Sequence, residues 1–234
     1  AEVPGADVIC IEDYDKGVVT AELAGVVIAR ARERGVQVIV DPARLSDYGK
    51  YRGAGVITPN REELSQAVGR RCDSIAAAAE AAGALVKHHE FSAAVVTLDR
   101  DGAVVVPAGG PGRHLPTTPR SVYDNTGAGD AVLAMLAAAT AAGADLVAAA
   151  ELANVAGGLE VEKFGCVPIT SEEVLAELRL EHRSNNGKLC TPDELIAEIQ
   201  LRRDRGERIA FTNGCFDILQ AGHVDLLKRC RREA

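Results

Sequence analysis

The sequence has 234 residues, of which 47% are hydrophobic and 26% are charged, and this composition excludes an intrinsically disordered chain. The formal net charge of -8 argues against nucleic acid or an anionic membrane as a partner, because both require a broad basic surface. The Ala-rich run after Asp130 is interrupted at Thr140 and Gly143, well before the ~20 residues of a membrane span. The six cysteines form no CxxC pair, which favours a reducing compartment, so we expect a cytoplasmic protein.

Short β-branched runs alternate with longer helical stretches in the first part of the chain, which favours a parallel α/β sheet. The predicted strands are DVICI (7–11), VQVIVDP (36–42) and GVITPN (55–60). Between the first two, residues 18–35 carry apolar side chains at helical spacing up to Gly35. Asn60 is expected to cap the helix after the third strand, and Asp73 to cap the Ala-rich helix that follows.

The stretch AAVVTLDRDGAVVV (93–106) predicts two strands around a polar turn at Asp99–Gly102. This hairpin would end the run of parallel strands. A Pro/Gly-rich connection follows, from Pro107 to Pro119. Three helices are then expected to begin near Ala128, Asp145 and Ser171.

A loss of periodicity in HRSNNGKLC (182–190) predicts an interdomain linker. We place the linker at 184–190, between a first domain at 1–183 and a second domain at 191–234. Thr191, Pro192 and Glu194 form a capping-box arrangement that opens a new helix.

The second domain then has a predicted strand, RIAFT (208–212), and a further helix, AGHVDLLKRCRR (221–232). One strand and two helices cannot bury a core of their own. We therefore expect only the start of a domain here.

The stretch YDNTGAGDAVLAML (123–136) joins a glycine-containing turn to an apolar helix. Because the first amides of a helix lack intrahelical partners, Gly127, Ala128 and Gly129 would offer N–H donors to charge on a transferring phosphoryl group. Asp130, in the first helical turn, would be placed to take a proton from an attacking hydroxyl. The alternative is a tight turn followed by an acid that the helix dipole favours.

DNTGAGDAVLAML closely resembles the C-terminal signature of the ribokinase-like (PfkB) sugar kinases. The resemblance implies that Asp130 is the catalytic base and that the amides of Gly127–Gly129 form the anion hole. It implies an α/β fold, a ribokinase-like three-layer architecture with helices on both faces of the sheet, of which the chain would hold the C-terminal part. The implied cofactors are ATP and Mg²⁺, and a role for a monovalent cation is left open.

Other segments resemble the same family in the same order. TPNREE resembles its NxxE motif, in which Asn60 and Glu63 would bind Mg-nucleotide and phosphate, with Glu63 acting on the metal indirectly. VVTLDRDG resembles the nucleotide-site strand and turn, with Thr97 and Gly102, and ANVAGGLEVEKFG resembles the helix beside the adenine pocket, with Asn154. Taken singly, Asn60 is equally explained as a helix cap, and Glu63 and Asn154 as ordinary polar helix positions. Their agreement in order favours the kinase.

The run IEDYDKG (11–17) resembles the heptose-phosphate branch of this family, through its DYxKG pattern. Asp13 and Lys16 are therefore candidate substrate-binding residues. A surface turn with an ion pair explains them equally well.

A second glycine-containing turn occurs in FTNGCFDILQAGHVDLL (211–227). It resembles the TxGxFDxxHxGH run of the cytidylyltransferase-like nucleotidyltransferases, which have a Rossmann-like fold and hold a nucleoside triphosphate with amides and two histidines. Gln220 stands where the first histidine is usual, and its amide can donate a hydrogen bond but cannot become cationic. The matching positions are Thr212, Gly214, Phe216, Asp217, Gly222 and His223.

A ribokinase-like part followed by the start of a nucleotidyltransferase is similar to the bifunctional heptose-7-phosphate kinases/heptose-1-phosphate adenylyltransferases of lipopolysaccharide-core synthesis. This resemblance implies ATP-dependent phosphorylation of a heptose 7-phosphate at its anomeric hydroxyl, and adenylyl transfer that gives ADP-heptose. It also implies a homodimer for the full-length protein. We expect the 234-residue chain alone to be weakly active or inactive.

Three other interpretations remain open. A ribokinase-like kinase for another sugar or nucleoside would share the first turn but has no need of the second. A non-catalytic fragment would keep the fold without turnover. A dinucleotide-binding oxidoreductase is the third, although GAGDAV lacks the third glycine of that fingerprint.

Overall fold

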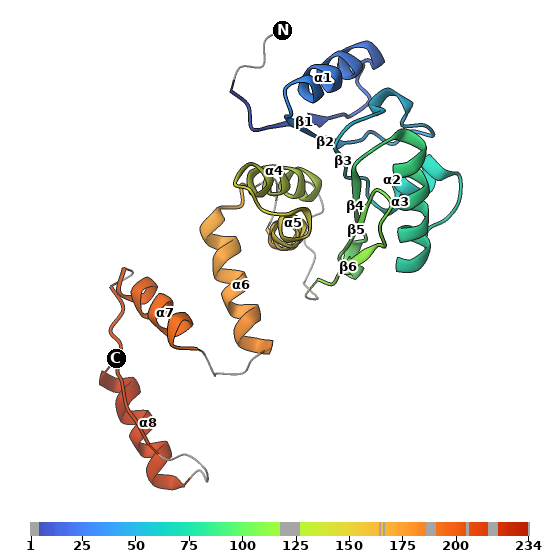
Figure 1. Cartoon of the computed structure of the whole chain (residues 1–234). Helices are drawn as coiled ribbons and strands as arrows, with labels where there is room; N and C mark the ends of the chain where they lie inside the picture. Colours follow the sequence, from blue (N-terminus) through green and yellow to red (C-terminus); the bar gives the residue numbers. More distant parts are fainter. Residues whose placement is uncertain are drawn as a thin grey trace. The chain divides into compact units, whose positions relative to one another are not determined.

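The computed structural model describes residues 5–117, 127–163, 165, 167–185, 191–204, 206–214 and 220–233 (Figure 1). The chain forms two compact units, Ala1–Glu177 and Leu178–Ala234. Within the described parts of the chain, none of the helices combines the length and the apolar character that a membrane crossing requires.

The first unit contains a six-stranded mixed sheet in which the strands are ordered as they occur in the chain (Figure 1). The first four strands are parallel, and the last two each run antiparallel to the strand before. The strands are β1 (Val8–Glu12), β2 (Gln37–Asp41), β3 (Val56–Ile57), β4 (Ala93–Thr97), β5 (Ala103–Pro107) and β6 (Arg113–Leu115). The predicted parallel strands and the hairpin are confirmed, whereas β6 lies inside the stretch expected to be a connection.

Alternating side chains of the strands enter two separate cores, one on each face of the sheet. In β2, Val38 and Val40 join the first core and Ile39 joins the second. The first core is covered by α1 (Ala21–Glu33), α2 (Arg61–Val68) and α3 (Ile75–His89). The second is covered by α4 (Ala128–Ala141) and α5 (Leu146–Glu160). The expected three-layer architecture is therefore confirmed.

Of the two helix caps predicted from the sequence in the first unit, one is confirmed and one is wrong. Asn60 caps α2, as predicted, and α5 begins where a helix was expected, with Asp145 as its cap. The prediction that Asp73 caps α3 is wrong, because the Ser74 side chain accepts the amide of Ala77 at 3.1 Å. Asp73 instead forms an exposed ion pair with Arg71.

Helix α6 (Ser171–Asn185) begins in the first unit, and the second unit contains α7 (Pro192–Asp204) and α8 (Ala221–Glu233). Helix α7 begins at Pro192 as expected, with the carbonyl of Thr191 accepting the amide of Leu195 at 2.9 Å. The predicted strand at 208–212 is wrong, because these residues form no regular structure. The described part of this unit has no strand to pair with them, and Phe211 is 86% exposed.

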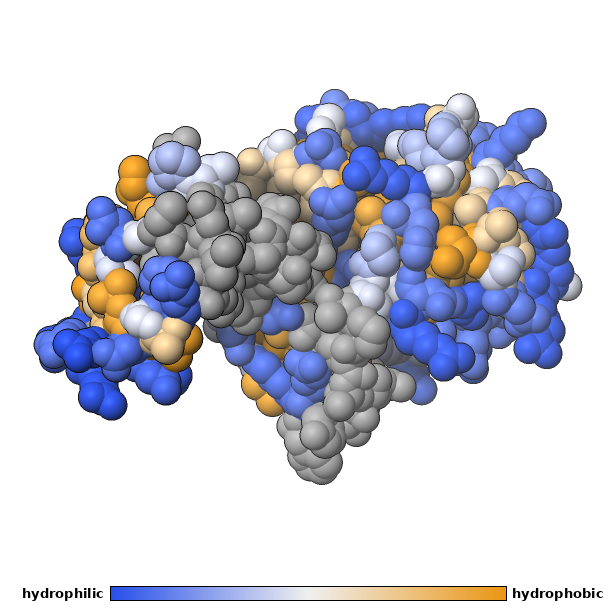
Figure 2. Space-filling model, turned by 90° about the horizontal axis from the view of Figure 1, so that it is seen from below, coloured by the Kyte–Doolittle hydropathy of each residue, from blue (hydrophilic) through white to orange (hydrophobic). Residues whose placement is uncertain are grey.

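The surface is mostly polar on the face shown in Figure 2, where hydrophilic residues surround scattered hydrophobic ones. Single exposed apolar side chains are normal on a folded protein. The apolar residues of the first unit are gathered in the two cores between the sheet and its helices. Ligands of open α/β sheets bind at the C-terminal ends of the parallel strands, so a site is expected there.

Candidate active site

The first turn of α4 carries the residues that the sequence singled out for chemistry. Gly127 is the residue before the helix and has φ +99°, a left-handed conformation that glycine adopts without strain. Ala128 begins the helix, and Asp130 lies exposed in its first turn. The first helical amides have no acceptor within the helix, so they are available to an anion. The remainder of the motif, 123–126, lies outside the described residues.

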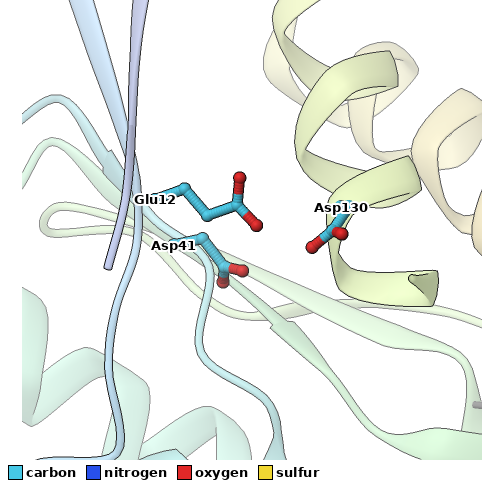
Figure 3. A group of neighbouring side chains, drawn as sticks. All are labelled: Glu12, Asp41 and Asp130. Atoms are coloured by element: carbon cyan, nitrogen blue, oxygen red, sulfur yellow. The ribbon is translucent and has the colours of Figure 1, made fainter. Parts of the chain in front are cut away.

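Asp130 faces two further carboxylates, Glu12 and Asp41 (Figure 3). Glu12 and Asp41 are the last residues of β1 and β2 and are paired in the parallel register. One carboxylate oxygen from each of the three residues lies within 4.8 Å of the others. An added Cβ on Gly129 would lie 3.5 Å from Asp41 Oδ2, so this glycine adjoins the cluster.

Glu12 and Asp41 were not among the site residues predicted from the sequence. A signal was present, because each is a carboxylate at the C-terminal end of a predicted parallel strand. Such ends meet at one edge of a sheet, where ligands bind in open α/β folds. Their register, which brings them opposite Asp130, required the structure.

Burial, with crowded negative charge added to it, raises the pKa values of the two strand-end acids. Burial raises the pKa of Asp41 to about 7, the nearby carboxylates add to the shift, and a 3.0 Å hydrogen bond from Thr58 opposes it. Burial and contact with Asp130 raise the pKa of Glu12. Oxygen ligands of this kind suit Mg²⁺, and a divalent cation would relieve the repulsion. The donor set therefore fits the metal expected from the sequence.

The loop after β1 brings Tyr14 to the same place. Its hydroxyl lies 3.1 Å from Asp130 Oδ1 and also contacts Glu12 Oε1. The hydrogen bond to Glu12 is the main cause that raises the pKa of Tyr14, with burial next. The phenol is therefore protonated at neutral pH and acts as a donor. Tyr14 was not among the site residues predicted from the sequence.

Asp13, a candidate substrate-binding residue, is buried beneath this loop. Its carboxylate pairs with Lys50, accepts the Tyr51 hydroxyl at 2.6 Å and accepts the Asp15 amide at 2.9 Å. Burial works against the charged form, but the hydrogen bonds from Lys50 and Tyr51 lower the pKa of Asp13 overall. Lys16 lies exposed in the same loop. The buried carboxylate of Asp13 is thus bonded to Lys50, Tyr51 and the Asp15 backbone, and these contacts anchor the loop after β1.

The NxxE segment and the turn after β4 lie side by side. Asn60 forms a β-bridge with Thr97, and its side chain accepts the Glu63 amide at 2.9 Å. Glu63 closes the capping box by accepting the Asn60 amide, also at 2.9 Å. Burial raises the pKa of Glu63. Gly102 ends the turn with φ +85°.

Arg61, which the sequence analysis did not assign to the site, ties these segments together. Its guanidinium donates to Cys72 O at 2.8 Å, to Leu98 O at 3.1 Å and to Asp101 Oδ2 at 2.5 Å. A single side chain thereby fixes the start of α2 against the turn that contains Gly102. The sequence around Arg61 could not predict these contacts, because they join residues up to 40 positions apart.

The remaining candidates lie elsewhere. Asn154, on α5, donates its side-chain amide to Pro116 O at 3.1 Å, so it contacts the segment after β6. In the second unit, His223 lies in the first turn of α8, and its Nδ1 accepts a hydrogen bond from the backbone N–H of Gln220 at 3.2 Å. Thr212 is half-buried and Gly214 is exposed. Phe216 and Asp217 lie outside the described residues.

Known proteins resemble the chain in sequence and in fold. The family model for pfkB family carbohydrate kinases matches residues 3–173. The protein named "Bifunctional protein HldE" from Shewanella baltica is 42% identical over 231 residues, which is 99% of this chain and 48% of that protein. The protein of the same name from Trichlorobacter lovleyi is 40% identical over 230 residues, 98% of this chain and 47% of that protein. The chain thus spans about half the length of these curated relatives.

Solved structures show the fold at lower sequence identity. A ribokinase from Arabidopsis thaliana, solved with ribose and ATP, has a TM-score of 0.66 at 22% identity, covering 74% of this chain and 56% of that one. Phosphofructokinase-2 from Escherichia coli, solved with potassium, has a TM-score of 0.64 at 20% identity, covering 73% and 56%. These likenesses agree with the mixed sheet and its two helical layers, and the family match covers the first unit almost completely. The chain belongs to the pfkB family of carbohydrate kinases.

Proposed function

We propose that the chain carries the ATP-dependent sugar kinase part of a heptose-phosphate kinase. The observation that carries this proposal is Asp130, exposed in the first turn of α4 directly after Gly127–Gly129 and opposite the ends of β1 and β2. Phosphoryl transfer needs little covalent help from a protein, but it needs positioning, stabilisation of charge and a base for the attacking alcohol. This edge of the sheet offers all three.

In the proposed reaction, Asp130 takes the proton of the anomeric hydroxyl as the sugar oxygen attacks the γ-phosphorus of ATP. The bond from that phosphorus to the β,γ-bridging oxygen breaks, and ADP leaves. The products are a heptose 1,7-bisphosphate and ADP, with one proton held by Asp130 and later released. The amides at the start of α4 stabilise the charge on the transferring group.

Mg²⁺ would neutralise phosphate charge when bound. Glu12 and Asp41 are the residues placed to hold it, near Asp130. Glu63 was assigned an indirect role at the metal; its carboxylate also closes the α2 capping box. A monovalent cation remains part of the proposal, and one of the similar solved structures contains potassium.

For the nucleotide, we assign Asn60 and Glu63 to the phosphate end, and Thr97 and Gly102 to the turn beside it. The β-bridge between Asn60 and Thr97 supports grouping these residues. Asn154 is assigned to the adenine end. The preference for heptose 7-phosphate rests on the DYxKG run, with Asp13 and Lys16 as binding-region residues.

We further propose a second activity, adenylyl transfer from ATP to heptose 1-phosphate, for the protein to which residues 191–234 belong. The division into a kinase domain at 1–183, a linker at 184–190 and the start of an adenylyltransferase at 191–234 is part of this proposal. Thr212, Gly214, Phe216, Asp217, Gln220 and His223 are its proposed nucleotide contacts. A homodimer, a cytoplasmic location and a place in lipopolysaccharide-core synthesis complete it.

The test is ADP release with a panel of sugars, measured for this chain and for the complete gene product. We expect heptose 7-phosphate to be preferred over fructose 6-phosphate and ribose, and Asp130→Asn to lower kcat by roughly 10²–10⁴-fold. Glu151→Gln, on the exposed side of α5, is the matched acid-to-amide control and should keep full activity. Equal rates with all sugars would exclude the heptose assignment, and full activity of Asp130→Asn would exclude the base.

A further inference from the structure

Tyr14 combines an exposed side chain with a specific contact to the proposed base. The residue is 62% exposed, yet its hydroxyl lies 3.1 Å from Asp130 Oδ1, across 116 positions of the sequence. The same hydroxyl contacts Glu12, which anchors the phenol on the β1 side of the cluster. The contact therefore joins the end of β1 to the start of α4.

Contacts of the two flanking residues, Asp13 and Asp15, fix the backbone position of Tyr14. The Asp13 side chain is 2% exposed and pairs with Lys50, and it accepts the Tyr51 hydroxyl at 2.6 Å. On the other side, Asp15 has φ +55° and donates its amide to Asp13 Oδ1 at 2.9 Å. A carboxylate with three partners thus holds the backbone on both sides of Tyr14. The phenol is presented by a rigid turn, although its ring is exposed.

A carboxylate that serves as a base needs one oxygen directed at the acceptor. Asp130 lies in the first turn of a helix, where its side chain can rotate unless another group fixes it. The phenol has one proton to donate, and when this proton is directed to Asp130 Oδ1 instead of Glu12 it fixes the rotation and leaves Oδ2 for the proton of the sugar hydroxyl.

We propose that Tyr14 is a positioning residue that orients Asp130 through its hydroxyl, and that the buried Asp13–Lys50–Tyr51 contacts hold it in place. The proposal rests on the proposed function of Asp130 as base. It gives the DYxKG run a role in orienting the base, in addition to the sugar contacts assigned to it. Tyr14 itself acts on the carboxylate and not on the phosphates.

The contact can be tested without turnover, because the chain has four tyrosines and no tryptophan. In a spectrum of ring-¹³C-labelled tyrosine, the Tyr14 signal is identified by its loss in Tyr14→Phe. We expect Asp130→Asn to shift this signal, and Glu151→Gln, at an acid of α5 that pairs with Arg113, to leave it unchanged. An unshifted Tyr14 signal in Asp130→Asn would overturn the proposal.

The positioning role is tested by steady-state kinetics in the complete gene product. Loss of one hydrogen bond to a charged group should lower kcat of Tyr14→Phe about 10-fold, with the KM for ATP changed less than about twofold. The thermal midpoint should stay the same, since the residue is exposed. Tyr14→Leu should lose no more activity than Tyr14→Phe if the hydroxyl alone matters.

A double variant separates positioning from other effects. Because Tyr14 acts through Asp130, Tyr14→Phe should cause no further loss when Asp130 is already Asn. An unchanged kcat in Tyr14→Phe, or a full 10-fold loss in the Asp130→Asn background, would overturn the role. If no sugar supports ADP release above the Asp130→Asn level, the proposed function fails, and the tyrosine spectrum then decides the Tyr14–Asp130 contact independently.

Discussion

Asp41 is a partly buried acid whose protonation should be visible in the stability of the fold. Its pKa is raised to about 7 in the folded protein, mainly by burial, against about 3.9 in an unfolded chain. The folded state therefore holds a proton that the unfolded state has already lost between pH 4 and pH 7. The contribution of Asp41 to the free energy of unfolding is fully present below about pH 4 and is lost as the pH rises to about 7.

We predict that Asp41→Asn removes this pH dependence. The shift of about three pKa units limits the effect to about 4 kcal/mol, gained by the variant relative to the wild type between pH 4 and pH 8. Urea unfolding at a series of pH values, without divalent cations, measures it. Asp73→Asn, at an exposed acid paired with Arg71, is the control and should follow the wild type. Parallel curves for Asp41→Asn and wild type would contradict the prediction.

Gly102 lies in a position that excludes a side chain for two reasons. Its φ is +85°, and an added Cβ would lie 2.1 Å from Leu115 O and 2.8 Å from Thr117 N. Gly102→Ala must therefore displace the backbone next to β6. We predict that it lowers the free energy of unfolding by more than about 2 kcal/mol, measured by urea unfolding.

A matched variant separates the two causes of this loss. Gly69, at the end of α2, has φ +66° with no atom within 4 Å of the added Cβ. Gly69→Ala should therefore cost only about 1–2 kcal/mol, from backbone strain alone. An equal loss in the free energy of unfolding for Gly102→Ala and Gly69→Ala would contradict the prediction, because it would mean that the backbone near Leu115 can shift without loss of stability.

At the scale of single residues, the sequence singled out Asp130 as a candidate base but did not predict which side chains surround it. A glycine-rich turn and a first-turn acid are local features, so a pattern within seven residues could reveal them. The approach of Glu12 and Asp41 depends on strand register, and the contact of Tyr14 spans 116 positions. Such contacts have no local signal.

At the scale of elements, the strands and helices with strong periodicity were predicted and the irregular ones were not. Strand β6 has three residues, and it exists because β5 offers a free edge for pairing. The run at 208–212 has a strand-like composition, but in the described part of its unit it has no partner strand. Composition shows what a segment can form, and pairing decides whether it does.

Arg61 is the contact that joins two such elements, α2 and the turn after β4. We predict that Arg61→Met lowers the free energy of unfolding by about 2–3 kcal/mol, because it leaves partly buried carbonyl groups of Cys72 and Leu98 without this donor. The amides of Asp101 and Gly102 should exchange faster with solvent, since the turn that holds them is released. Urea unfolding and amide hydrogen exchange measure the two effects.

The control for Arg61 is a guanidinium that lies on the surface. Arg44 pairs with Glu62, and the two side chains are 59% and 73% exposed. Arg44→Met should change the free energy of unfolding by no more than about 1 kcal/mol. A loss at Arg61 no larger than at Arg44 would show that the three hydrogen bonds of Arg61 do not stabilise the turn.

At the scale of the whole molecule, both hydrophobic cores of the family fold are formed within the first unit of the chain. Residues of both cores lie between Ile11 and Ala153, and each core joins one face of the sheet to its own helices. Alternation along β2 divides its apolar residues between the two faces of the sheet. By contrast, α8 has no buried residue. Stability should therefore come from the first unit.

We predict that residues 1–185, a chain ending with α6, fold with the same urea midpoint as the 234-residue chain. Both cores are complete within that length, so removing residues 186–234 takes away no buried side chain of either core. The transition should be followed by far-ultraviolet circular dichroism, with helix signal lost only in proportion to α7 and α8. A second truncation, 1–145, removes α5 and opens the core that it covers together with α4, so it should unfold at a clearly lower midpoint or fail to fold. If 1–185 behaved like 1–145, the stability of the kinase core would depend on residues beyond Asn185, and the division of the chain argued from its cores would be wrong.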